Sequence, residues 1–285
     1  MNRSTPDRIL PELEGLSDSN VEGTLLVPLL GRARAAQRFP EVLPDPAGDR
    51  LLHDLGVTVR ASTNAERFGD FCYVVRSHAF DRMVRDFLER NPDGVVLELG
   101  AGLDTTFWRA GQKARSWYAV DFPSVARLRG EYLQEDPRLC TVAADLSENS
   151  WMERVETAGK PVLVIACGVL HYLSHDRVAR LMDGLQAAFG GVDVGFDCSS
   201  KDGLKHSQRQ LEKAGSSARM VYWVDDPEVE VERWGVGAKL LESGHYFRGA
   251  PVPRGIGIKA RIFMGLVALT RGSRIVRAHL PAVAG

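Results

Sequence analysis

Two glycines separated by one residue, Gly100 and Gly102, stand between an apolar run at 95–99 and a segment that can begin a helix at Thr105. A strand, a glycine-rich turn and a helix in this order form the first unit of a nucleotide-binding α/β sheet. Because glycine has no Cβ atom, such a turn lets the backbone approach a ligand closely, and the following helix directs its free N–H groups to the same place. The spacing predicts a nucleotide-type site, with a tight turn that binds no ligand as the alternative.

The acidic residues around this turn indicate which nucleotide it suits. A dinucleotide fingerprint needs a third small residue where Thr105 stands. Asp104 would repel a pyrophosphate, whereas a cationic amino group would be attracted to Asp104 and to Glu98 at the end of the predicted strand. S-adenosylmethionine has an amino-acid tail and a sulfonium but no phosphate. We therefore expect an S-adenosylmethionine site, and we disfavour a dehydrogenase.

Two further carboxylates follow predicted strands at the same edge of the sheet. Asp121 ends a strand at 115–121, roughly 20 residues after the glycine turn, where an acid that binds the ribose hydroxyls is expected. The alternative is that Asp121 caps the helix that begins immediately afterwards. Asp145 follows a strand at 138–143 and can accept a hydrogen bond from the adenine amino group. Its alternative role is to cap a helix at 147–156.

An arginine and a histidine complete the set of candidate side chains. Arg76 lies inside a predicted helix at 64–90 and can bind a carboxylate through two parallel hydrogen bonds, but it is also explained as an exposed charge or as a partner of Asp81. His171 follows a predicted strand at 161–166 and is the best candidate for a general base. A phenol acceptor would benefit from that base, whereas a carboxylate acceptor is already ionised at pH 7. The alternative for His171 is a ring hydrogen-bonded to a backbone carbonyl.

The elements that must position these residues alternate between strand and helix, which is typical of a doubly wound, mostly parallel α/β sheet. Strands are predicted at 95–99, 115–121, 138–143, 161–166 and 192–197. Before them, amphipathic patterns predict helices at 21–37, 47–55 and 64–90. We therefore expect an N-terminal helical cap or lid over 1–92 and an α/β core over 93–250.

The C-terminal third of the chain is less regular. Antiparallel edge strands are expected at 219–223 and at 239–241 with 245–247. After Glu242 the sequence has no acidic residue, and seven arginines and lysines alternate with apolar residues. This pattern predicts a basic amphipathic helix within 251–285 that packs on the core. Its basic face would lie in solvent, line a pocket for an anionic acceptor or touch an anionic membrane.

The composition excludes several classes of protein. The 285 residues carry a net charge of −1, without the basic excess of a nucleic-acid-binding protein. No apolar run approaches the ~18 residues that a membrane span needs. The four cysteines, Cys72, Cys140, Cys167 and Cys198, are far apart and lack the spacing of metal ligands, so we expect no metal site. Together with the absence of a signal peptide, they indicate reduced thiols in the cytoplasm.

Four motifs, in order along the chain, resemble those of the leucine carboxyl methyltransferase family of class I S-adenosylmethionine-dependent enzymes. The motifs are Glu98–Thr105, Val120–Pro123, Ala144–Leu146 and Gly168–Leu173, within a similarity that extends over 20–240. Within the family, the chain is similar to the bacterial polyketide O-methyltransferases of the tetracenomycin type. The resemblance implies a doubly wound, mostly parallel sheet of seven strands, S-adenosylmethionine as cofactor and S-adenosylhomocysteine as product.

The resemblance also implies roles for single residues. Arg76 would hold the methionine carboxylate, Asp121 would bind the ribose, and Tyr172 would lie near the methyl-transfer region with His171. Cys167 stands where the family often has Glu, so we expect it only to line the site. The remaining expected cofactor contacts are Glu98, Gly100, Gly102, Asp104, Thr105, Phe122, Asp145, Leu146 and Gly168.

Three functions are compatible with the sequence. The leading one is an O-methyltransferase that acts on a carboxylate or phenol of a small, polyketide-like secondary metabolite. A protein or peptide carboxyl methyltransferase is the runner-up, and it would need an open groove. The third is a binding protein that keeps the fold without turnover. The expected partner is a small-molecule acceptor, with no nucleic acid and no stable membrane insertion, and a monomer and a homodimer are equally compatible.

Overall fold

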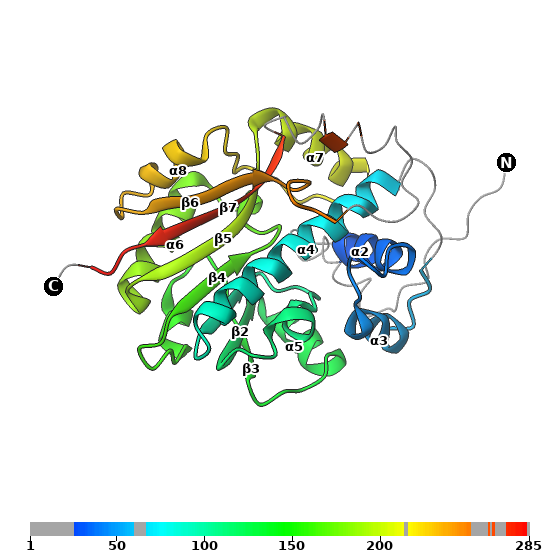
Figure 1. Cartoon of the computed structure of the whole chain (residues 1–285), viewed down its shortest axis with the longest axis horizontal. Helices are drawn as coiled ribbons and strands as arrows, with labels where there is room; N and C mark the ends of the chain where they lie inside the picture. Colours follow the sequence, from blue (N-terminus) through cyan, green and yellow to red (C-terminus); the bar gives the residue numbers. More distant parts are fainter. Residues whose placement is uncertain are drawn as a thin grey trace.

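The computed structural model describes residues 26–59, 67–213, 216–251, 262, 264–265 and 272–283. One seven-stranded sheet runs in the order β3-β2-β1-β4-β5-β7-β6 (Figure 1). Its strands are β1 (Val95–Leu99), β2 (Ser116–Asp121), β3 (Leu139–Ala143), β4 (Val162–Ala166), β5 (Val192–Ser199), β6 (Lys239–His245) and β7 (Ser273–Leu280). The first five pair in parallel, and β7 is antiparallel to both β5 and β6. The predicted doubly wound, mostly parallel sheet is confirmed.

Helices cover both faces of the sheet because its central strands are apolar on both sides. Val95 and Leu97 of β1 pack in one core cluster with α6 (His175–Phe189), whereas Val96 packs in another with α4 (Arg67–Arg90). The other helices are α2 (Leu26–Arg38), α3 (Pro46–Asp54), α5 (Pro123–Tyr132), α7 (Lys201–Lys213) and α8 (Pro227–Arg233), with the short helices η2 (Phe107–Gly111), η3 (Ser150–Arg154) and η4 (Leu170–Tyr172).

The strand order reverses at the centre of the sheet. From β1 the chain passes outward through β2 and β3, and it then returns to β4 on the other side of β1. The loops that leave the carboxyl ends of β1 and β4 therefore diverge, and the crevice between them is where ligands bind in sheets of this kind. The glycine turn follows β1 and the segment 167–173 follows β4, so both predicted motifs flank this point.

Within the described residues, three helices precede the sheet near the predicted positions, although the first expected residues of α2 and α4 lie outside this part of the chain. The C-terminal half of α4 packs on the sheet through Phe80, Val84 and Phe87. The division into a cap at 1–92, a core at 93–250 and a tail at 251–285 stays a prediction. None of the helices in the described residues is long and apolar enough to cross a membrane.

The C-terminal elements correct two sequence predictions. The expected basic helix is wrong for its last part, because Ser273–Leu280 forms β7, where Val276, Ala278 and Leu280 are buried at alternate positions against β5. Most of the rest, between 252 and 271, lies outside the described residues. The edge strand expected at 219–223 is also wrong, because this segment is irregular and its Val221 N–H donates to the carbonyl of His171.

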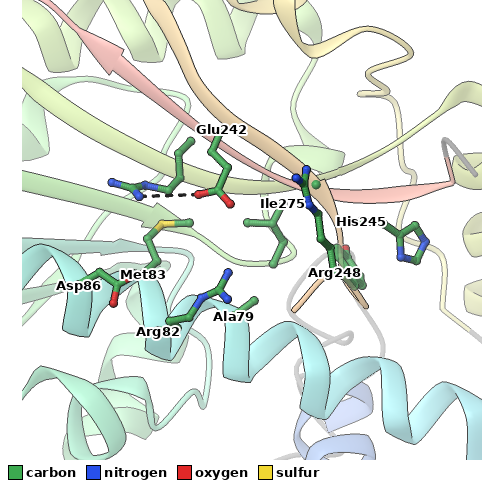
Figure 2. A pocket seen from close by; sticks show the side chains of 11 residues that line it. Ala79, Arg82, Met83, Asp86, Glu242, His245, Arg248 and Ile275 are labelled. Carbon is green, nitrogen blue, oxygen red and sulfur yellow. Dashed lines mark ion pairs between the residues drawn. The ribbon is translucent and has the colours of Figure 1, made fainter. Parts of the chain in front are cut away.

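A small pocket lies between α4 and the antiparallel edge of the sheet (Figure 2). Arg82 of α4, Glu242 of β6 and Arg277 of β7 line it, with an Arg277–Glu242 ion pair at 3.8 Å. Its volume of about 40 Å³ leaves room for little more than bound water. Its lining residues His245 and Tyr246 also line a second, larger cavity.

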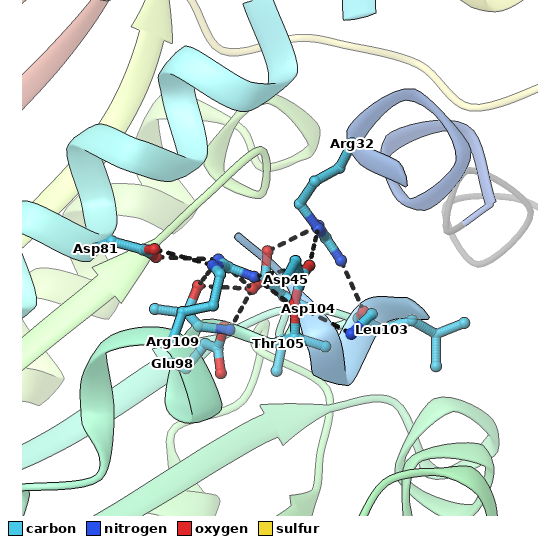
Figure 3. Close-up of polar contacts among 12 residues, drawn as sticks. Arg32, Asp45, Asp81, Glu98, Leu103, Asp104, Thr105 and Arg109 are labelled. Atoms are coloured by element: carbon cyan, nitrogen blue, oxygen red, sulfur yellow. Dashed lines mark hydrogen bonds and ion pairs between the residues drawn. The ribbon is translucent and has the colours of Figure 1, made fainter. Parts of the chain in front are cut away.

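A buried ionic network joins the N-terminal helices to the turn after β1 (Figure 3). Arg109 of η2 donates to both oxygens of Asp81 on α4 at 2.9 and 3.0 Å, and to Asp45 and Asp104 at 3.2 Å each. Arg32 of α2 donates to Asp45 at 3.3 Å and to Asp104 at 3.0 Å. Three carboxylates thus share two guanidiniums. Because Asp45 is the N-cap of α3, the network fixes all three N-terminal helices against the turn.

We expect that Arg109→Met destabilises the fold strongly, since it leaves three carboxylates, two of them buried, short of a partner. Breaking a buried ion pair by removing one partner typically costs about 3–5 kcal/mol. The free energy of unfolding, measured by urea denaturation at pH 7, tests this. The matched control is Arg82→Met on α4, whose side chain is exposed. A loss below ~1 kcal/mol for Arg109→Met would show that the network contributes no more than surface pairs do.

Candidate active site

A cavity of about 750 Å³ opens at the carboxyl ends of the parallel strands. This volume lies within the range of about 300–1,000 Å³ that small-molecule sites occupy. All the predicted site residues except Thr105 line it, namely Arg76, Glu98, Gly100, Gly102, Asp104, Asp121, Phe122, Asp145, Leu146, Cys167, Gly168, His171 and Tyr172. The tertiary structure therefore brings these residues, which span nearly one hundred positions of sequence, around one space.

The turn after β1 needs both of its glycines. Gly100 and Gly102 have φ angles of +57° and +50°, in the left-handed region that side chains with a Cβ rarely adopt. A Cβ on Gly100 would lie 2.4 Å from Cγ2 of Val169, which follows β4. The absence of side chains at the turn therefore lets the loops after β1 and β4 approach each other at the floor of the cavity.

The carboxylate of Asp121 contacts this turn. Its Oδ2 accepts a hydrogen bond from the Gly102 N–H at 2.6 Å, and its Oδ1 accepts from the Phe122 N–H at 2.7 Å. The N-cap of α5 is Phe122, and no side chain caps that helix. The carboxylate therefore bridges the ends of β1 and β2 beside the cavity.

Asp145 differs from its capping alternative. No helix begins at Ser147, because the segment forms only the short 3₁₀ helix η3 with Asn149 as its N-cap. The Asp145 Oδ1 instead accepts from the Ser147 N–H at 2.7 Å, which forms a local turn at the cavity wall. The side chain is exposed at the position expected of an adenine contact.

Arg76 is neither an exposed charge nor a partner of Asp81. Its side chain is 15% exposed, and Nη1 donates to Oδ2 of Asp197 at 3.2 Å. The guanidinium lies over the ring of Tyr73 at 5.2 Å, and Nε is buried with no hydrogen-bond partner among the described residues. Asp81 instead pairs with Arg109. Asp197 thus binds one edge of the Arg76 guanidinium and Tyr73 packs against its face, while the buried Nε–H still has no partner among the described residues.

Asp197 is a site residue that the sequence analysis missed. It lies in the second half of β5, fully buried, and accepts from the Gly168 N–H at 2.5 Å and from the Tyr246 hydroxyl at 2.8 Å. Burial alone would raise the pKa of Asp197, but the Arg76 guanidinium beside it holds the pKa well below its usual range. The sequence signal that could have identified Asp197 is its position near the carboxyl end of the fifth predicted strand.

His171 faces the same carboxylate. Its Nε2 is 3.6 Å from Oδ2 of Asp197, and its Nδ1 is buried with no hydrogen-bond partner among the described residues. The alternative of a ring bonded to a backbone carbonyl is therefore absent from the described contacts. Tyr172, next in η4, lines the cavity. The role of His171 as a general base stays a prediction.

The three polar residues around the turn have different surroundings. Glu98 is buried at the cavity wall, where burial and the charge of Asp104 raise its pKa to about 7 although the Trp117 indole donates to it at 3.0 Å. Asp104 lines the cavity while pairing with the network arginines. Thr105 is fully buried and does not line the cavity, because its hydroxyl donates to Asp45 at 2.7 Å. We predicted that Thr105 contacts the cofactor directly. The structure instead places Thr105 behind the cavity wall, where it supports Asp45.

These residues fit the group that the sequence predicted. The glycine turn lines the cavity with backbone, Arg76 retains an unsatisfied buried N–H, and Glu98 and Asp104 place negative charge at the wall. Arg76 suits the carboxylate of an amino-acid ligand, and Glu98 and Asp104 suit its ammonium or sulfonium group. Burial raises the pKa of the Cys167 thiol, so this residue lines the cavity as a neutral group.

A doubly wound sheet with a glycine turn after β1, an acid at the end of β2 and a cavity at the strand-order reversal defines the class I methyltransferase type of protein. The model of the leucine carboxyl methyltransferase family matches residues 26–186, more than half of the chain, and the chain belongs to this family. S-adenosylmethionine is the cofactor that methyltransferases of this family use.

Curated relatives match parts of the chain. The tetracenomycin polyketide synthesis O-methyltransferase TcmP of Streptomyces glaucescens is 30% identical over 159 residues, which cover 54% of this chain and 57% of TcmP. The tRNA wybutosine-synthesizing protein 4 of Rattus norvegicus is 32% identical over 148 residues, which cover 39% of this chain and 22% of that protein. The chain therefore spans little more than half of TcmP and about a fifth of the other relative.

Two solved structures are similar to this chain in fold alone. The crystal structure of a methyltransferase candidate from Thermobifida fusca aligns with a TM-score of 0.57 and 20% identity, covering 82% of this chain and 93% of that one. A protein of Streptomyces avermitilis aligns with a TM-score of 0.56 and 14% identity, covering 82% of this chain and 89% of that chain.

We expect Arg76→Ala to weaken binding of S-adenosylhomocysteine by about 1.5–3 kcal/mol, the range for a lost hydrogen bond to a charged group. This corresponds to about 10- to 150-fold in Kd. Calorimetric titration measures it, and 5′-methylthioadenosine, which lacks the amino-acid carboxylate, is the matched ligand. Its affinity should stay unchanged. Equal losses for both ligands would mean that the variant disturbs the cavity and that Arg76 does not read the carboxylate.

The ionisation of Glu98 should make cofactor binding depend on pH. Because its pKa in the free protein is about 7, a proton must leave before a cationic ligand binds beside the carboxylate. The affinity for S-adenosylmethionine should therefore rise as the pH increases from 6 to 7.5, with proton release measurable by calorimetry in buffers of different ionisation enthalpy. Glu98→Gln should remove this slope. An unchanged slope in the variant would assign it to another group.

Proposed function

We propose that this protein transfers the methyl group of S-adenosylmethionine to a carboxylate or phenol oxygen of a small, polyketide-like secondary metabolite. The observation that carries the proposal is the continuity of the cavity, which extends from the glycine turn to the helix α7 and so has room for a cofactor and an acceptor side by side. The similarity to TcmP supports the oxygen acceptor and its polyketide character.

In the cofactor half, the chain offers one group for each part of the ligand. Arg76 would hold the amino-acid carboxylate, Asp121 would accept from the ribose hydroxyls, and Asp145 with Leu146 would contact the adenine. The sulfonium supplies an activated methyl group when the cofactor is bound. The protein's contribution is to align the acceptor oxygen with that methyl group and to exclude water from the cavity.

The acceptor half combines hydrogen-bonding and apolar side chains. One face of α7 lines the cavity through Gly203, His206, Ser207, Gln210 and Leu211, which recur at helical spacing. Tyr73 of α4 and Phe247 after β6 add aromatic surface around the same space. Polar groups set among aromatic and aliphatic ones suit a planar acceptor that carries several oxygen substituents.

The role of His171 depends on which of the two possible acceptor oxygens is methylated. A phenol with a pKa near ~10 must lose a proton at about the time of methyl transfer, and His171 at the carboxyl end of β4 would take it. A carboxylate acceptor needs no such base. A protein or peptide carboxylate is the runner-up acceptor, and the same assay can include it.

The test uses methyl-labelled S-adenosylmethionine with three acceptors: 3-hydroxy-2-naphthoate, 2-naphthol and a peptide ending in leucine. We expect labelled product from a naphthalene and none from the peptide. Treatment with alkali then identifies the atom, because a carboxylic ester releases labelled methanol and an aryl ether does not. Labelled peptide alone would favour the runner-up. Binding of S-adenosylhomocysteine without any turnover over a wider panel of aromatic acids and phenols would favour a binding protein.

His171→Ala provides the second arm of this test. If the product is an ether, the variant should lower kcat by about 10²–10⁴-fold, the usual contribution of a general base, with unchanged affinity for S-adenosylhomocysteine. If the product is an ester, kcat should change little. Loss of kcat with an ester product would mean that His171 orients the acceptor and is not a base.

A further inference from the structure

A buried arginine occupies the side of the glycine turn that faces away from the cavity. Arg129 of α5 is 1% exposed and is absent from the cavity wall. Its Nη1 donates to the carbonyl oxygens of Ala101, Gly102 and Asp104 at 3.3, 2.7 and 3.2 Å. One guanidinium nitrogen therefore holds three carbonyls of the turn, and no sequence motif indicated this residue.

These contacts determine how the peptide planes of the turn are oriented. In a trans peptide the C=O and the following N–H point in opposite directions. Because the carbonyls of Ala101 and Gly102 face Arg129, the N–H groups of Gly102 and Leu103 face the other side. There the Gly102 N–H donates to Asp121 at 2.6 Å, and Leu103 lines the cavity. Arg129 thus supports the orientation of the ribose acid without touching it.

Arg129 also brings a positive charge to the base of the site. Among the described residues no carboxylate pairs with it, and its Nε and Nη2 are buried without a hydrogen-bond partner. A buried cation without a paired carboxylate is costly, so packing alone does not explain it. The groups that face Glu98 are Asp104 from the turn, Arg109 from η2, Arg129 from α5 and the Trp117 indole from β2. Arg129 and Arg109 both favour the ionised form of Glu98.

We propose that Arg129 is the positioning residue of the cofactor site, which fixes the peptide planes of the glycine turn and favours a negative Glu98 at the cavity wall. It thereby sets both the affinity for the cofactor and the pH range over which the cofactor binds. This inference rests on the assignment of the glycine turn and Asp121 to the cofactor.

The test compares Arg129→Met, Arg129→Gln and Arg129→Lys with Arg127→Met, an exposed arginine on the same helix. Calorimetry gives the Kd of S-adenosylhomocysteine at several pH values, and circular dichroism with thermal unfolding checks the fold. Arg129→Met should weaken binding at least tenfold and move the pH midpoint upward. Arg129→Gln, which keeps donors without charge, should also move the midpoint upward with a smaller loss of affinity. Arg129→Lys, which keeps both, should restore the midpoint and most of the affinity.

A purely structural role would not move the pH midpoint of a folded variant. If Arg129→Met fails to fold, the comparison of Arg129→Gln with Arg129→Lys decides the question. The inference is overturned if the folded neutral variants have the affinity and midpoint of Arg127→Met. Wild-type protein that does not bind S-adenosylhomocysteine would overturn the cofactor assignment together with this inference. If the wild type binds S-adenosylhomocysteine and the Arg129 variants bind it equally well with the same pH midpoint, only the positioning role is overturned.

Discussion

The sharing of three carboxylates, two of them buried, between Arg32 and Arg109 is the constraint on which the rest of this structure depends. The five participants come from three N-terminal helices, the glycine turn and η2, and their charges are almost entirely removed from water. Charges in such surroundings are stable only when every partner is in place, so the segments can pack in few arrangements. The network therefore fixes the part of the cavity wall that α2 and α4 form, and it sets the position of Asp104 beside the turn.

The acids of the cavity are held by the protein before any ligand arrives. Asp121 accepts from two backbone N–H groups, and Asp197 accepts from a backbone N–H, a phenol hydroxyl and a guanidinium. Such contacts orient each carboxylate, so little reorganisation is left for the binding step. The Gly102–Asp121 contact also joins the turn after β1 to the end of β2, and the Gly168–Asp197 contact joins the loop after β4 to β5.

The side of the cavity next to the segment after β6 depends more on aromatic packing. Phe71 of α4 stacks on Phe247 at a centroid distance of 5.7 Å and meets Phe39 edge-on at 5.6 Å. This cluster holds the segment after β6 against the N-terminal helices, and the neighbouring Tyr246 reaches Asp197. Arg76 and the segment after β6 therefore meet at one carboxylate. A change in the aromatic cluster is physically linked to Arg76 through Asp197, although the two are far apart in the sequence.

The sequence by itself determined the five parallel strands and the glycine turn, because burial patterns and turn residues act over a few neighbouring positions. The succession of acids at strand ends likewise placed most of the cavity wall. Tertiary structure decided the partners. Arg76 pairs with Asp197, 121 residues away, and not with the nearby Asp81, since the fold brings β5 beside α4. Likewise, Ser273–Leu280 is a strand because β5 offers it an open edge and buries every second side chain. No local pattern could determine these pairings, because each depends on which distant segment arrives at the same place.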